Sequence, residues 1–121
     1  MDNAILRDAY LADANLSSAT LKDADLSGAN LRGAIVRDAD LTGADLTGTN
    51  LNADLTGVNL RSADLSGANL RDADLSGADL TNAAVTTEQL REAESLKGAT
   101  MPNGKKYEVW LKSREEGDSG S

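Results

Sequence analysis

Large apolar side chains recur at every fifth position between residues 6 and 85, with a single interruption of the spacing. Ala stands two positions before nearly every one of these centres, and Asp or Asn stands directly before most of them. The centres are Leu6, Leu11, Leu16, Leu21, Leu26, Leu31, Val36, Leu41, Leu46, Leu51, Leu55, Leu60, Leu65, Leu70, Leu75, Leu80 and Val85. One five-residue unit therefore fills residues 4–85 in 17 copies.

A period of five fits neither regular element. On an α-helix, five residues advance a side chain by about 140° net, so the leucines would spiral around the axis. In a flat strand, an odd period would send them to alternate faces. A short extended segment followed by a turn in every unit does give one buried stripe of leucine.

The turn signal lies two positions after the centre. Gly stands there seven times, and Gly adopts the positive φ that the third residue of a type II turn requires. Asp and Asn tolerate that φ less well, so another turn type is expected at some corners that hold them. Those corner residues are Asp8, Asp13, Asp23, Asp38, Asp72 and Asn82.

The A-[D/N]-L-x-x unit, with Ala73-Asp74-Leu75-Ser76-Gly77 as one copy, resembles that of the pentapeptide-repeat family. The resemblance covers about 80 of the 121 residues. It implies a mainly β fold, a right-handed quadrilateral β-helix of about four coils, with the Ala and centre columns inward. Because four large and four small side chains would fill each coil, no cofactor or small-molecule ligand is expected.

The spacing between Leu51 and Leu55 is four residues, so one corner lacks a residue. The two departures from Ala, Thr49 and Val58, lie in the units on either side of the unit 53–57. Larger side chains could refill a gap that the shorter corner leaves, or the two could be ordinary drift. Both interpretations stay open at this point.

After Val85 the pattern changes. Thr86 and Gln89 have the spacing of a capping box, and Val85 with Leu90 that of a hydrophobic staple. We predict a capping α-helix over residues 86–98, ending at Gly98. An extension is predicted over 99–112. It begins with residues 99–101, which resemble part of one repeat unit, and a turn at 102–104. Apolar and polar residues then alternate weakly from 105 to 111. Residues 113–121 are expected to be disordered. Similar endings occur in cyanobacterial members of the family.

Composition narrows the chemistry further. The chain has no Cys and no His, which removes thiolate chemistry, the commonest metal ligand and the usual acid–base residue. No membrane span and no signal peptide are visible, so a cytoplasmic protein is expected. The net charge is −8, of which residues 1–85 carry −7 through 13 Asp and 6 Lys or Arg. Such acidity disfavours direct binding of nucleic acid and of anionic membranes.

Three outward carboxylates are candidate chemistry. Asp25, Asp45 and Asp64 should stack along one face at about 4.8 Å per coil, where like charges should raise one another's pKa. Acid–base catalysis of the glycoside type needs a cleft, and calcium needs 6–8 converging oxygens. A flat wall supplies neither, so this acidic ladder favours a structural role, no metal site and no enzymatic activity.

Two classes of function remain. The first is a structural or interaction module that binds an unidentified protein partner through its flat faces. The alternative is an acidic DNA mimic, as in family members that bind a type II topoisomerase such as gyrase. About four coils span roughly 20 Å, only about six base pairs, and Arg or Lys interrupts the acidic field at Arg7, Lys22, Arg32, Arg37, Arg61 and Arg71. We favour the interaction module.

Apolar outward residues near the N-terminus form a candidate interaction surface. Ile5, Tyr10 and Ile35 stand where Asp or Asn is usual. Beside an uncovered first coil, they favour an end-to-end homodimer through the N-terminal coil. The alternative is that the aromatic tail from Tyr107 to Trp110 folds back over this surface.

Overall fold

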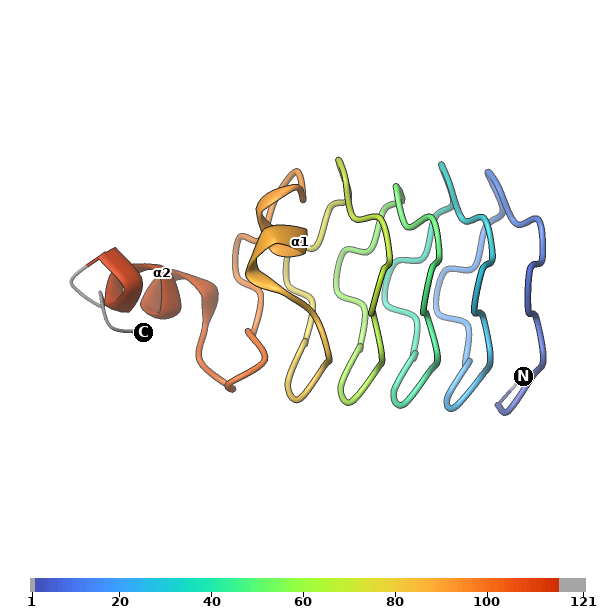
Figure 1. Cartoon of the computed structure of the whole chain (residues 1–121), viewed down its shortest axis with the longest axis horizontal. Helices are drawn as coiled ribbons and strands as arrows, with labels where there is room; N and C mark the ends of the chain where they lie inside the picture. Colours follow the sequence, from blue (N-terminus) through green and yellow to red (C-terminus); the bar gives the residue numbers. More distant parts are fainter. Residues whose placement is uncertain (1, 116–121) are drawn as a thin grey trace.

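The computed structural model of the chain describes residues 2–115, with side chains described for residues 2–112. The backbone forms a stack of similar coils, with the N-terminus at one end and a helical segment at the other (Figure 1). Parallel β-bridges join each outward residue to the one 20 positions later, as in Ile5–Asp25 and Asp25–Asp45. The offset is 19 where a pair spans the short unit, as in Asp45–Asp64. Since a unit has five residues, each coil contains four units and has four sides.

We name the four sides by their outward columns of bridged residues. Face A holds Ile5, Asp25, Asp45, Asp64 and Ala84; face B holds Tyr10, Asn30, Asn50 and Asn69; face C holds Asn15, Ile35, Asp54, Asp74 and Ser95; face D holds Thr20, Asp40, Asn59, Asp79 and Thr100. The chain therefore completes four coils by residue 83 and adds most of a fifth by residue 101.

Every regular corner uses the same turn. The N–H of Ala29 donates to the Leu26 carbonyl over 3.0 Å, and Gly28 between them has φ +70°. Asp23, at an equivalent corner, has φ +59° although it is not Gly. The expected change of turn type at the Asp and Asn corners is therefore wrong. Stacking explains this uniformity, because the Asp23 N–H donates to the Thr42 carbonyl of the next coil over 2.8 Å.

The inward columns form the core. From residue 21 to residue 83, every centre and every inward residue two positions before it is buried. Leu6, Leu11 and Leu16 of the first coil are only half-buried, whereas Leu21 is fully buried. The expected uncovered first coil is therefore closed at this corner, where the Asn3 N–H donates to the carbonyl of Lys22, the neighbour of Leu21, over 2.8 Å.

Helix α1 spans Thr87–Arg91 and has the predicted capping box, but it is shorter than the predicted helix over 86–98. It places Leu90, 20 residues after Leu70, in the core. After α1 the chain returns to the coil, since Ser95 bridges Asp74 and Thr100 bridges Asp79. Gly98 therefore occupies a corner at φ +73° and does not end the helix.

The C-terminal segment reverses direction and becomes helical. The predicted turn at 102–104 forms, and Thr100 pairs antiparallel with Lys106. Helix α2, Tyr107–Glu115, replaces the predicted weak alternation and includes the first residues of the predicted tail. The rest of that tail, 116–121, lies outside the described residues.

The aromatic residues of α2 pack at the C-terminal end. The rings of Tyr107 and Trp110 stack with centroids 6.1 Å apart and contact the core from that side. Because the N-terminus lies at the opposite end of the stack, the idea that this segment folds over the N-terminal coil is wrong (Figure 1).

Candidate interaction surfaces

The outward Asp and Asn residues hold the turns in place. The Asp45 Oδ1 atom accepts hydrogen bonds from the Thr47 backbone N–H at 3.0 Å and from its hydroxyl at 2.7 Å. The Asn30 Oδ1 atom accepts the Arg32 N–H at 3.0 Å in the same way. A side-chain oxygen that accepts the N–H two residues later defines an Asx turn. These residues therefore have a structural role on every face.

The carboxylates of face A stack, and the pKa of two of them, Asp25 and Asp64, is lowered. Bridges place Asp25 beside Asp45 and Asp45 beside Asp64. The Ser27 hydroxyl and N–H, followed by Arg7, lower the pKa of Asp25 to about 2. The Ser66 hydroxyl and N–H lower the pKa of Asp64. Our expectation of raised pKa values was wrong for Asp25 and Asp64, because direct hydrogen bonds to the charged form outweigh repulsion between neighbours.

Three arginines neutralise outward carboxylates of the next coil. Arg7 pairs with Asp25 at 2.7 Å, and Arg37–Asp54 and Arg61–Asp79 approach to 3.4 Å. Each arginine directly follows a centre and reaches the outward residue of its own face one coil later. All three ion pairs are largely solvent-exposed, so each contributes little to stability. Their main consequence is a weaker acidic field on faces A, C and D.

Face B differs from the other three faces. Its outward residues after Tyr10 are Asn30, Asn50 and Asn69, which bridge one another in sequence. The arginine beside Asn30, Arg32, would reach Asn50 one coil later, where it finds no carboxylate. Within the part of the chain that the structure describes, neither Arg32 nor Arg71 forms an ion pair.

The short corner lies in the third coil, directly after face B, and contains Asn52. The Ala53 N–H donates to the Leu51 carbonyl over 2.8 Å, which closes a γ-turn around Asn52. In neighbouring coils the second corner residue donates its N–H to the next coil, as Gly33 does to the Asn52 carbonyl. Here that residue is missing, and the Asn52 Nδ2 atom donates to the Arg71 carbonyl at 2.8 Å instead. A side-chain amide thus replaces the missing backbone donor.

A depression of about 400 Å³ accompanies the short corner. Its lining includes Arg32, Gly33, Asn52, Asn69, Arg71 and Asp72. Thr49 and Val58 are both buried, and the Thr49 hydroxyl donates to the Leu46 carbonyl at 2.8 Å. That these two side chains compensate for the missing residue stays a prediction.

The three apolar outward residues do not lie on one face. Ile5 is 76% exposed on face A, and Tyr10 is 77% exposed on face B. Ile35 is 39% exposed on face C, between Asn15 and Asp54. Ile5 and Tyr10 thus flank one corner of the first coil, and Ile35 is separate from them.

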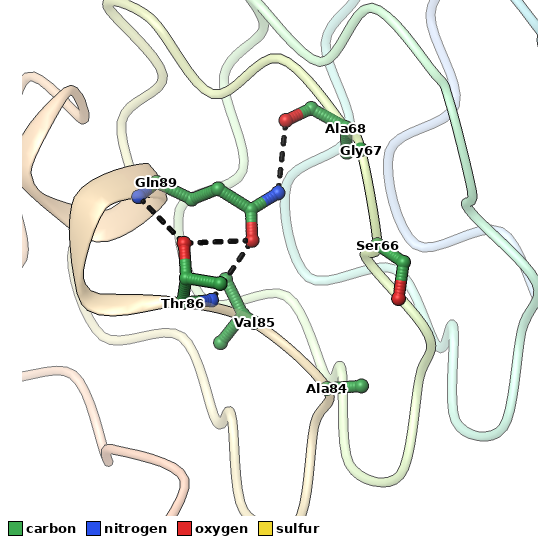
Figure 2. Close-up of a pocket in the computed structure, with 7 residues that line it drawn as sticks. All are labelled: Ser66, Gly67, Ala68, Ala84, Val85, Thr86 and Gln89. Atoms are coloured by element: carbon green, nitrogen blue, oxygen red, sulfur yellow. Dashed lines mark hydrogen bonds between the residues drawn. The ribbon is translucent and has the colours of Figure 1, made fainter.

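Where α1 leaves the coil, a second open depression of about 510 Å³ forms between residues 66–68 and 84–89. Figure 2 shows Gln89 extending from α1 across this junction. Its Nε2 atom donates to the carbonyls of Leu65 at 2.7 Å and Ala68 at 2.9 Å. Gln89 therefore both caps its own helix and supplies the donor that a further coil would give to Ala68.

Other groups replace a further coil around residues 98–101. The Met101 N–H donates to the Lys105 carbonyl, and the Tyr107 N–H donates to the Ala99 carbonyl, both over 2.7 Å. The Gly98 N–H donates to the Glu108 carboxylate at 3.0 Å, and this bond is the main cause that lowers the pKa of Glu108. The chain thus supplies its own partners at the C-terminal end.

Residues 2–115 contain neither a membrane-spanning helix nor a cluster of metal ligands. No described helix is long and apolar enough to cross a membrane. No group of three or more Asp or Glu side chains in this region is arranged to hold a metal ion.

Sequence reasoning missed the amide column of face B and the replacement bonds of Asn52, Gln89 and Glu108. Writing the chain in rows of 20, shifted by one at the short unit, aligns Asn30, Asn50 and Asn69, so the column was visible in principle. The replacement bonds depend on where the chain turns after Val85, and the repeat says nothing about that.

Comparison with known proteins agrees with this geometry. The family model for pentapeptide repeats matches residues 1–33, 24–53 and 53–86. No curated protein matches the chain. HetL, a pentapeptide repeat protein involved in heterocyst differentiation regulation from the cyanobacterium Nostoc sp. strain PCC 7120, is 38% identical with a TM-score of 0.82. That match covers 88% of this chain and 51% of HetL.

A second structure, the pentapeptide repeat protein Rfr23 from the cyanobacterium Cyanothece 51142, is 39% identical with a TM-score of 0.62, over 81% of this chain and 63% of that one. Full-length QnrB1, a plasmid-mediated fluoroquinolone resistance protein, is 21% identical with a TM-score of 0.51. That match covers 96% of this chain and 72% of QnrB1. At this low identity the likeness shows the fold alone. The chain thus spans about half the length of HetL and under two thirds of Rfr23. The chain belongs to the pentapeptide-repeat family.

Proposed function

We propose that the chain is a non-enzymatic interaction module that binds a protein partner through the outer walls of its coil. We also infer the right-handed sense of the coil, which the family resemblance implies. The inward columns are filled by Leu, Ala and Val, so side chains free to contact another molecule lie on the four walls and at the two ends.

The observation that carries this proposal is the regular array of outward side chains. Bridged residues on one face repeat once per coil, at about 4.8 Å. The array differs between faces, with carboxylates on face A and amides on face B. Such a rigid, chemically distinct wall can bind a partner without ordering a loop, which lowers the entropic cost of association.

The proposal is tested by reconstitution. Immobilised protein should retain one protein from a lysate of the source organism, and the purified pair should form a stoichiometric complex by isothermal titration calorimetry. A core variant such as Leu46→Ala that unfolds the coil should lose this binding. Failure of every retained protein to bind when purified would contradict the proposal.

DNA mimicry is the second candidate, and the stacked Asp25, Asp45 and Asp64 favour it. The ion pair of Arg7 with Asp25 and the uncharged column of face B count against it. A gyrase supercoiling assay separates the candidates. Inhibition that disappears in the triple variant D25N/D45N/D64N would support mimicry, and no effect at high micromolar concentration would exclude it.

We further propose that the N-terminal coil can pair end to end with a second copy. Among the described residues, the backbone N–H groups of Ile5, Tyr10 and Asn15 donate no hydrogen bond. Leu6 and Leu11 beside them are half-buried. A two-fold dimer would cover both edges at once. Sedimentation velocity should show dimers that Ile5→Asp/Tyr10→Asp abolishes, and a monomer at high micromolar concentration would contradict this proposal.

A further inference from the structure

We infer that face B and the corner that follows it, with Asn30, Asn50, Asn69, Arg32 and Arg71, form a docking strip for a carboxylate-rich, extended polypeptide segment. This inference rests on the proposed function and names the face and the chemistry of the partner. We call these five residues the donor strip.

The side-chain amides of the strip have NH₂ groups that are available to a partner. The Oδ1 atoms of Asn30 and Asn69 accept the N–H groups of Arg32 and Arg71, both at 3.0 Å. Within residues 2–112, no hydrogen bond uses the Nδ2 atoms of Asn30, Asn50 or Asn69. Because the Asx turn occupies the oxygens of Asn30 and Asn69, these two amides present their NH₂ groups to a partner. Asn50 and Asn69 are exposed, and Asn30 is half-buried.

The two arginines of the strip form no ion pair with any described residue, because their face lacks carboxylates. Arg7, Arg37 and Arg61 each find a carboxylate one coil later on their own face. On face B the corresponding residues are Asn50 for Arg32 and Gln89 for Arg71. Asn in place of Asp therefore removes acceptors from the face and, among the residues that the structure describes, leaves two guanidinium groups without an ion pair. Both arginines are exposed.

The short corner brings the two arginines to one depression. Asn52 lies between them in the stack, and both line the hollow of about 400 Å³ around it. Carboxylates suit this set because guanidinium forks bind them bidentately and amide NH₂ groups add neutral donors. One amide per coil, about 4.8 Å apart, favours an extended segment running along the stack.

Charge complementarity selects a polypeptide over a nucleic acid. The strip is a donor surface on a chain of net charge −8, and Asp72 lies at its margin. A duplex would extend beyond the strip to the carboxylates of faces A and C, where its phosphates would be repelled. A single extended segment covers face B alone.

The test is an NMR titration of the full chain with an octaglutamate peptide at low ionic strength. We expect saturable shifts of the side-chain signals of Asn30, Asn50, Asn69, Arg32 and Arg71. The variant N30D/N50D/N69D should bind at least about tenfold more weakly, because three carboxylates enter the strip. Asp on face A forms the same Asx turn as Asn30 and Asn69, and the Asn50 side chain bonds no other coil, so this variant should keep the wild-type thermal unfolding temperature.

Two matched controls sharpen the result. R32Q/R71Q should weaken binding about tenfold, whereas R37Q/R61Q, with the same charge change on ion-paired arginines, should weaken it less than about twofold. An octathymidylate added in place of the peptide should cause no saturable shift in the strip. No saturable peptide binding, equal losses in both arginine pairs, or preferential binding of the oligonucleotide would each overturn the inference.

The test also separates the inference from the proposed function. If the reconstituted complex described above forms but is unaffected by N30D/N50D/N69D, the donor strip is wrong and the interaction module stands. If no purified partner binds while the peptide binds as expected, the module is wrong and the strip remains as a carboxylate-binding surface.

Discussion

The two ends of the coil stack differ in how they end the hydrogen-bond ladder. At the C-terminal end, Gln89, Glu108 and the reversed segment from Lys105 to Tyr107 supply partners that a further coil would have given. At the N-terminal end of the described chain, only the turn at Asp2 and Asn3 precedes the first coil, and its bonds to Lys22 cover one corner. The leucine layers follow this difference, since Leu90 is buried and Leu11 is half-buried.

The interior coils and the terminal coils therefore satisfy their backbone hydrogen bonds in different ways. The repeat alone satisfies the regular interior coils, because their backbone groups meet partners in the neighbouring coils, whereas the short corner also needs the Asn52 side chain. A terminal coil has no such equivalent and needs specific donors and acceptors at the same positions. At the C-terminal end, the Gln89 amide of α1 and the Glu108 carboxylate supply such partners on the sides where they lie.

Removing the C-terminal closure should have the largest effect. Truncation after Val85 removes Leu90 and Met101 from the core, about 3–6 kcal/mol of apolar burial, and uncovers the last layer of leucines. We expect the truncated chain to aggregate, as judged by light scattering and size-exclusion chromatography. A truncated chain that stays monomeric with the wild-type unfolding midpoint would show that the C-terminal segment does not close the stack.

Substitutions along one inward column measure the difference between the ends directly. Leu51→Ala and Leu90→Ala should each cost about 2–5 kcal/mol, because both side chains are fully enclosed and leave a cavity. Leu11→Ala should cost roughly 1 kcal/mol, since this side chain is already half exposed. Urea unfolding followed by circular dichroism gives the three values. Equal costs at all three positions would contradict an open N-terminal end.

The replacement bonds should have intermediate effects. Gln89→Ala removes the donor to Leu65 and Ala68, and Asn52→Ala removes the donor to Arg71. Each should reduce the free energy of unfolding by about 1–2 kcal/mol, the cost of leaving a carbonyl without its partner. The fluorescence of Trp110, the single tryptophan, reports the first change near its own end. As a control, Asn50→Ala, whose side chain bonds no other coil, should change stability less than Asn52→Ala.

Acid should weaken the fold gradually. The pKa of Asp25 is about 2 in the folded chain, below its ordinary value of 3.8, so its contribution is full above that ordinary value. That contribution is lost as the pH falls from about 4 to about 2. The stability difference between wild type and D25N should therefore shrink across this range. A constant difference would show that the bonds from Ser27 and Arg7 do not favour the charged carboxylate.

Glu108, at the C-terminal end of the stack, should also contribute stability that depends on pH. Its pKa is lowered chiefly by the Gly98 N–H, so its contribution also disappears on acidification. E108Q should leave Trp110 fluorescence less sensitive to acid than in wild type, with only a small effect at neutral pH. Identical acid titrations of wild type and E108Q would contradict the capping role of this carboxylate.

The sequence was most informative where one local rule repeats. A turn every five residues follows from the leucine spacing, and the burial of residues 21–83 agrees with it. The prediction failed where the rule stops. The capping box at Thr86 identified the start of α1, but the pattern of Leu90, Ala93 and Leu96 fits a helix and a resumed coil equally well, so the end of α1 was misplaced.

The surfaces were harder to predict than the core. Column positions require the number of units per coil, which the resemblance supplied and the spacing did not. The pKa of Asp25 depends on Ser27 and Arg7, and neighbouring charges alone suggested the opposite shift. The bond from Asn52 to Arg71 joins residues 19 apart, and only the stacking of coils brings them together.

Amide hydrogen exchange, followed by NMR on a dilute monomeric sample, tests the difference between the two ends most directly. The N–H groups of Gly98, Met101 and Tyr107 have partners at the C-terminal end and should exchange slowly. Those of Ile5, Tyr10 and Asn15 should exchange rapidly, although Asp25, Asn30 and Ile35, one coil further along the same faces, should be protected. Equal protection in the first and second coils would contradict the account.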